Sequence, residues 1–61
     1  SVDAQRALRV LSSQQRAVVY LTYWDDLTPA QVADLLGVGE GTVRKQLARA
    51  REQLRKVLDD H

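Results

Sequence analysis

The sequence of 61 residues contains no cysteine and has only one proline and three glycines. Without cysteine, a disulfide framework and a cysteine-ligated zinc site are both excluded. Long hydrophobic runs are also missing: no segment approaches the roughly 18 apolar residues that suggest a membrane span. We also expect no signal peptide. We therefore expect a cytoplasmic protein that makes no contact with a membrane.

Residues suited to catalysis are scarce. His61 is the only histidine and stands at the end of the sequence. Asp25 and Asp26 are adjacent and shortly precede a predicted helix start, where negative charge is favourable for electrostatic reasons alone. The sequence has neither a phosphate-binding loop nor a set of metal ligands. It therefore predicts no enzyme activity, no cofactor and no small-molecule substrate.

A chain this short is expected to form one small domain. Residues 1–61 would bury only about 60% of the surface that the unfolded chain exposes, so we expect marginal stability. A hydrophobic content of 44% suffices for a modest core but not for a large catalytic cleft. Because the sequence begins at Ser1 rather than at methionine, we expect it to be a fragment of a longer protein.

The net charge of +1 conceals a segregation of charge along the chain. Residues 21–40 include four acidic residues and no lysine or arginine, whereas residues 42–58 carry six basic residues against one acidic residue. The positive excess in the second segment favours a polyanionic partner such as nucleic acid. A solvated helix surface would carry the same kind of charge, so charge alone does not decide.

Hydrophobic spacing and capping signals predict an all-α fold of four helices. The first helix is expected over about Val2 to Val10. The second is expected after Ser12, an N-cap whose capping-box partner is Gln15. The apolar sides of these two helices are predicted to be formed by Ala4, Leu8 and Leu11, and by Ala17, Val18, Leu21 and Trp24.

The third helix has the clearest start signal in the chain. Thr28 is a predicted N-cap, Pro29 occupies the first helical position, and Gln31 completes a second capping box. A hydrophobic staple is expected to join Leu27 to the third helix, and Gly37 is expected to end that helix in the left-handed conformation. The predicted apolar stripe consists of Val32, Ala33, Leu35 and Leu36.

The fourth helix is predicted from Glu40 to about Leu58. Its apolar stripe consists of Val43, Leu47, Ala50, Leu54 and Leu58, at steps of four, three, four and four residues. Two helices joined by a short turn that contains glycine form a helix-turn-helix. In this turn, Val38 is expected to reach the core, and Gly39 and Gly41 allow the next helix to begin with little steric bulk. The second helix of such a motif enters the major groove of DNA.

Helical geometry selects the residues of the fourth helix that would face DNA. Each residue advances by about 100° around the axis, so the face opposite the apolar stripe is exposed. Arginine and lysine on that face suit guanine or phosphate, and alanine permits close approach to a thymine methyl group. Threonine and the first-turn amides suit phosphate. The predicted DNA-binding residues are Thr42, Arg44, Lys45, Ala48, Arg49 and Arg51, the last at phosphate or in solvent.

At these positions the sequence resembles region 4 of bacterial sigma factors of the sigma-70 family, above all the extracytoplasmic-function group. The resemblance covers about residues 11–58 and is carried by "LSSQQR", "AQVADLLGV", "GTVR" and "LARAREQL". It implies recognition of the −35 promoter element in transcription initiation, with base contacts on Arg44, Lys45, Ala48 and Arg49. It also implies docking on the flap of the RNA polymerase β subunit. An anti-sigma factor is a further candidate partner, for exposed apolar surface. The sequence departs from the family pattern at Gly39, where serine is usual, and at Lys45 and Gln46.

Two other classes of protein remain open at this point. The output domain of a LuxR-type regulator shares much of the same pattern, although the "LARAREQL" ending favours a sigma factor. A protein-interaction module would instead use Tyr20, Tyr23 and Trp24 as a surface patch. For Trp24 and one of the two tyrosines, the sequence favours a place in the core over such a patch.

Overall fold

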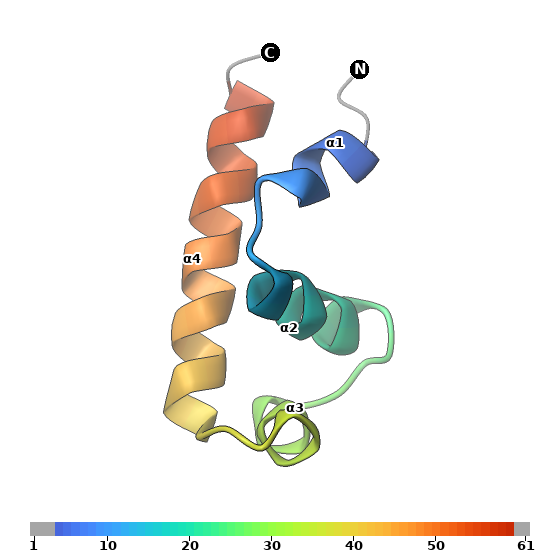
Figure 1. The fold of residues 1–61 in the computed structure, drawn as a ribbon, viewed down its shortest axis with the longest axis vertical. Helices are drawn as coiled ribbons and strands as arrows, with labels where there is room; N and C mark the ends of the chain where they lie inside the picture. The colour runs from blue at the N-terminus through green and yellow to red at the C-terminus, as the bar shows by residue number, and fades with distance from the viewer. Residues whose placement is uncertain (1–3, 60–61) are drawn as a thin grey trace.

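The computed structural model describes residues 4–59, which form four helices (Figure 1). Helix α1 spans Ala4–Arg9, α2 spans Ser13–Tyr23, α3 spans Pro29–Leu36 and α4 spans Glu40–Asp59. The predicted all-α fold with a C-terminal helix-turn-helix is confirmed. The predicted start of the first helix at Val2 lies outside the described residues. None of the helices within residues 4–59 is long and hydrophobic enough to cross a bilayer.

Both predicted capping boxes are present, and they define where α2 and α3 begin. The Gln15 backbone N–H donates to the Ser12 hydroxyl over 3.1 Å, and the Ser12 N–H donates to the Gln15 side chain over 3.0 Å. The reciprocal bonds between Thr28 and Gln31 measure 2.8 and 3.2 Å. Each box satisfies two backbone donors that a helix start otherwise leaves without an intrahelical partner.

The turn of the helix-turn-helix is built as the sequence predicted. Gly37 ends α3 with φ 70° and ψ 34°, in the left-handed region. The next N–H, that of Val38, donates to the carbonyl of Ala33 over 3.0 Å, which is the long bond of a Schellman motif. The Val38 side chain is partly buried and packs on the core. The left-handed conformation of Gly37 and this hydrogen bond therefore end α3 and turn the chain toward α4.

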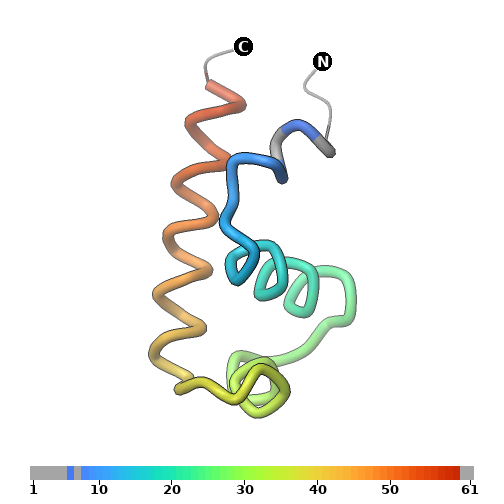
Figure 2. Tube along the Cα trace, in the orientation of Figure 1, coloured from blue at the N-terminus to red at the C-terminus, as the bar shows by residue number. Residues whose placement is uncertain are grey.

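The core lies where α2, α3 and α4 meet. It consists of the buried side chains of Val18, Val32, Ala33, Val43 and Leu47. In Figures 1 and 2, α4 runs along one side of the molecule and the three shorter helices lie along it. Because α4 packs against each of them, its buried stripe holds the fold together. Leu27, the predicted staple residue, packs on the same cluster as Val32.

Several apolar residues that were predicted to lie inside are exposed. In α3, Leu35 is 64% exposed, because the short helix turns only its Val32 and Ala33 side fully into the core. In α4, the stripe is buried as far as Ala50 and Leu58 is 56% exposed, because α2 and α3 lie along the earlier turns and only the short α1 lies beside the last ones. Leu8 of α1 is only partly covered.

The aromatic residues also contradict the sequence-based preference. Trp24 is 77% exposed, and Tyr20 and Tyr23 are each more than half exposed. Trp24 is the residue that ends α2, where α3 and α4 do not cover that side of the helix. The rings of Tyr20 and Trp24 stack on each other with centroids 5.8 Å apart and planes 8° from parallel. The three aromatics therefore form a surface feature and not part of the core.

Candidate nucleic-acid interface

The start of α4 is fixed by the turn and not by a side-chain cap. The Gly39 carbonyl accepts the first helical hydrogen bond, from the Val43 N–H, over 3.1 Å. Gly39 therefore occupies the N-cap position, where its missing side chain leaves the first-turn amides without a side-chain acceptor from residue 39. Its φ lies outside the left-handed range, unlike that of Gly37.

The buried side of α4 determines which of its residues face outward. Val43, Leu47 and Ala50 are buried against the other helices. On a helix, the row opposite to them contains Gly41, Lys45, Ala48 and Glu52, and all four residues are exposed. We call this row the outer row of α4. It faces away from α2 and α3, so no described element stands in front of it.

All six residues predicted to bind DNA are exposed on α4. Five of them lie within the first half of the helix, on the outer row or on its flanks: Thr42, Arg44, Lys45, Ala48 and Arg49. Arg51 is turned toward α2 instead: its Nε donates to the Tyr23 hydroxyl over 3.0 Å. The first five thus form one continuous surface, and Arg51 stands at its edge.

Two ion pairs adjust the charge of α4. Arg44 lies 3.6 Å from the Glu40 carboxylate, one helical turn earlier, and both side chains are about half exposed or more. Arg55 pairs with Glu52 at 3.0 Å, so the one acidic residue of the outer row is partly neutralised. Pairs this exposed contribute little to stability. A phosphate or base edge can therefore compete for Arg44 at low cost.

Gln46 has a structural role that the sequence did not reveal. It is half-buried, and its side-chain amide donates to the Gln14 side chain at the start of α2 over 2.8 Å. This bond links residues 32 positions apart, so no local sequence pattern could have predicted it. Gln46 thus faces the domain, and Lys45 alone of these two neighbours faces outward.

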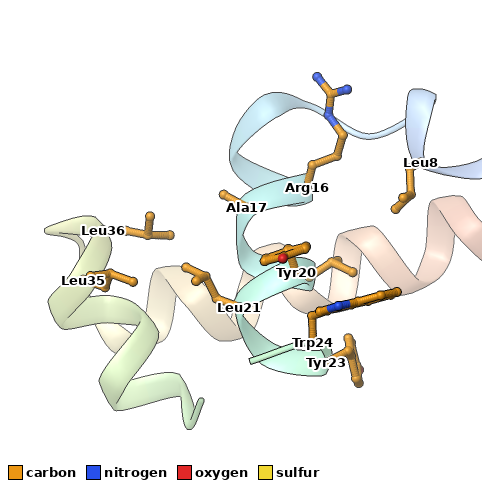
Figure 3. A pocket seen from close by; sticks show the side chains of 10 residues that line it. Leu8, Arg16, Ala17, Tyr20, Leu21, Tyr23, Trp24, Leu35 and Leu36 are labelled. Carbon is orange, nitrogen blue, oxygen red and sulfur yellow. The ribbon is translucent and has the colours of Figure 1, made fainter. Parts of the chain in front are cut away.

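An apolar groove lies on another side of the molecule, between α1, α2 and α3. Its volume is about 790 Å³. Tyr20 and Tyr23 of α2 and Trp24, just after α2, line it, with Leu35 and Leu36 of α3 facing them and Leu8 of α1 nearby (Figure 3). Arg16 is its one charged lining residue. Exposed apolar surfaces of this kind mark places where proteins meet partners.

The family model and the relatives that match this chain all belong to sigma factors. Residues 1–54 match the family model for region 4 of sigma-70 factors. The chain is 40% identical over 53 residues to the RNA polymerase sigma-E factor of Streptomyces antibioticus, covering 87% of this chain and 29% of that protein. It is 41% identical over 58 residues to the extracytoplasmic-function factor SigM of Mycobacterium tuberculosis and 36% identical over 56 residues to SigW of Bacillus subtilis, covering 95% and 92% of this chain. It spans about 30% of the length of each of these relatives.

Proposed function

The chain belongs to the region 4 family of sigma-70 factors, and we propose that it binds the −35 element of bacterial promoters during transcription initiation. The binding surface is the N-terminal half of α4. Residues 1–61 would act as one DNA-binding domain of a longer sigma factor, in the cytoplasm. Membership of the region 4 family agrees with the expectation that the domain is not an enzyme. It also favours a sigma factor over a LuxR-type regulator.

One observation carries this proposal. The second helix of a helix-turn-helix presents three basic side chains and a small residue on its outward face, with its apolar face locked in the core. This is the geometry by which such a helix enters the major groove. The groove-facing residues are then Arg44, Lys45, Ala48 and Arg49. Arginine can offer two donors to guanine, and alanine leaves room for a thymine methyl group.

The flanking residues are assigned to the DNA backbone. Thr42 lies in the first turn, where a hydroxyl and backbone amides suit a phosphate oxygen. Arg51 lies at the edge of the surface and can exchange its Tyr23 partner for a phosphate. Such contacts position the helix without reading sequence. Arg51→Ala should therefore weaken binding to all sequences alike and reduce the slope of affinity against salt by about one unit.

The experiment compares binding to a −35 duplex and to a scrambled duplex, by fluorescence anisotropy at low salt. Replacing Arg44 or Arg49 by alanine should cost about 1–3 kcal/mol on the specific duplex and relax preference at one base pair. Arg16→Ala is the matched control, because it removes the same side chain from the groove between α1, α2 and α3. Unchanged affinities for both duplexes in Arg44→Ala would contradict the assigned role.

The apolar groove is proposed as the surface that binds RNA polymerase, through the β flap. Three exposed aromatic residues and two leucines offer a partner a continuous hydrophobic contact in a groove that no residue of α4 lines. Aromatic residues are enriched in protein interfaces, where they often dominate the binding energy. An anti-sigma factor that covers the same groove would exclude the polymerase.

Trp24→Ala tests the groove. We expect it to weaken binding of the chain to purified RNA polymerase core by about 2 kcal/mol, as loss of a buried aromatic anchor does. Leu58→Ala is the control, because Leu58 is also apolar and exposed but does not line the groove. Equal affinities of Trp24→Ala and the parent chain would rule out this site.

A further inference from the structure

Gly41 is a glycine that the fold itself does not require. It lies within α4, and its φ is not in the left-handed range. A Cβ built at this position would meet no atom within 4 Å, apart from the backbone of its own helix turn. The neighbouring Gly37 differs, because its φ of 70° is strained for other residues. Neither backbone conformation nor internal packing explains why residue 41 lacks a side chain.

The absence of a side chain has a cost for this small domain. Glycine inside a helix is less stable than alanine because it loses more conformational freedom on folding. Gly41→Ala should therefore raise the melting temperature, by up to about 4 °C for a domain of this size, because the full cost applies to helix interiors and Gly41 is the second residue of α4. A residue that destabilises the fold without serving its packing points to a requirement outside the domain.

The position of Gly41 shows what that requirement concerns. Gly41 belongs to the outer row of α4, one turn before Lys45 and two turns before Ala48. A side chain at residue 41 would point away from the buried Val43 and straight outward. It would thus stand between α4 and whatever the outer row binds.

We propose that Gly41 is the point of closest approach between α4 and the base edges of the DNA. Because residue 41 has no side chain, the first turn of α4 can approach the floor of the major groove closely. Lys45 and Arg44 then reach the bases. A methyl group at residue 41 holds the helix outward and lengthens these contacts. Gly41 is then a specificity-determining residue of the proposed interface, and this inference rests on the proposed DNA-binding function.

The test measures stability and DNA binding on the same variants of the 61-residue chain. We expect Gly41→Ala to melt at a higher temperature than the parent and yet to bind the −35 duplex about tenfold more weakly, the equivalent of one base contact. Affinity for a scrambled duplex should change much less, because base edges and not phosphates are concerned. Gly41→Ser should weaken specific binding in the same way.

Gln53→Ala is the control, because it places alanine at an exposed position of α4 outside the outer row. It should leave the affinities for both duplexes unchanged. If Gly41→Ala keeps the affinity of the parent for the −35 duplex, the inference is wrong while the proposed function stands. It is also wrong if both duplexes are weakened equally. If the parent chain itself does not distinguish the −35 duplex from the scrambled one, the proposed function is at fault instead.

Discussion

At the scale of single residues, Gly39 is an N-cap without a capping side chain. Its φ is not left-handed, and an added Cβ would meet only the Thr42 hydroxyl, at 4.0 Å. Gly39→Ser should therefore stabilise the domain by a few tenths of a kcal/mol, because a serine hydroxyl can accept from a first-turn N–H. Thermal unfolding followed by circular dichroism measures the difference.

Gly37→Ser is the matched comparison for that change. The same substitution two residues earlier meets a φ of 70° and should cost about 1 kcal/mol or more. A lower melting temperature for Gly39→Ser than for the parent chain would mean that the turn constrains residue 39 in a way that its backbone does not reveal.

Asp26 is the other residue with a left-handed backbone, at φ 59°. Aspartate tolerates this conformation better than most residues because its short side chain can bond locally. At an ordinary helical site alanine is more stable than glycine. At residue 26 we expect the reverse order, with Asp26→Gly more stable than Asp26→Ala by about 1 kcal/mol. Urea unfolding of the two variants would show this order, and alanine being the more stable would refute it.

At the scale of the helices, stability depends on how completely each leucine is covered. Leu47 of α4 is 6% exposed, Leu36 is half-buried and Leu35 is largely exposed. Replacing Leu47 by alanine should cost about 2–5 kcal/mol, which can unfold a domain of this size. Leu36→Ala should cost less, and Leu35→Ala should stay within about 0.5 kcal/mol. Chemical denaturation gives the order, and an equal cost at Leu35 and Leu47 would contradict the packing described.

The sequence predicted the helix boundaries well because those boundaries depend on neighbours in the chain. The hydroxyls of Ser12 and Thr28 bond amides three residues away, and the conformation of Gly37 follows from a preference of glycine itself. The stripe of α4 was predicted for the same reason, since its periodicity is local. Where it ceases to be buried, after Ala50 and the half-buried Leu54, depends on how far the other helices reach. That information is not local.

In the candidate site, too, the sequence predicted what depends on chain neighbours and missed what depends on helix packing. The outward direction of Lys45 and Ala48 follows from helical periodicity once the buried side is known. The bonds from Arg51 to Tyr23 and from Gln46 to Gln14 connect α4 to α2, and they depend on how two helices cross. The exposure of Trp24 was missed for a related reason. A large aromatic residue is favoured inside, but the other three helices leave one side of α2 uncovered.

At the scale of the whole molecule, the two proposed binding surfaces are distinct and adjoin where Arg51 donates to the Tyr23 hydroxyl. The outer row of α4 faces away from α2 and α3, whereas the groove is lined by α1, α2 and α3. We therefore expect DNA and a protein partner to bind at the same time, with competition confined to the edge at Arg51 and Tyr23.

The single tryptophan allows this separation to be measured. Trp24 lines the groove and is 77% exposed. Its fluorescence emission should shift to shorter wavelength when RNA polymerase core covers the groove and should keep its wavelength when a −35 duplex is added. The core titration requires subtraction of the polymerase signal, for which the Trp24→Ala variant serves as the blank. A shift of similar size with DNA alone would place the two surfaces together and contradict the arrangement.

The arrangement of helices in Figure 1 also has a mechanical consequence. Helix α1 and the last turns of α4 lie at one end of the molecule, and the turn at residues 37–39 lies at the other. A pulling force applied between the start of α1 and the end of α4 would load the contact between these two helices first. That contact would open progressively, one helical turn after another. The helix-turn-helix lies at the unloaded end and would keep its shape while the domain is under tension.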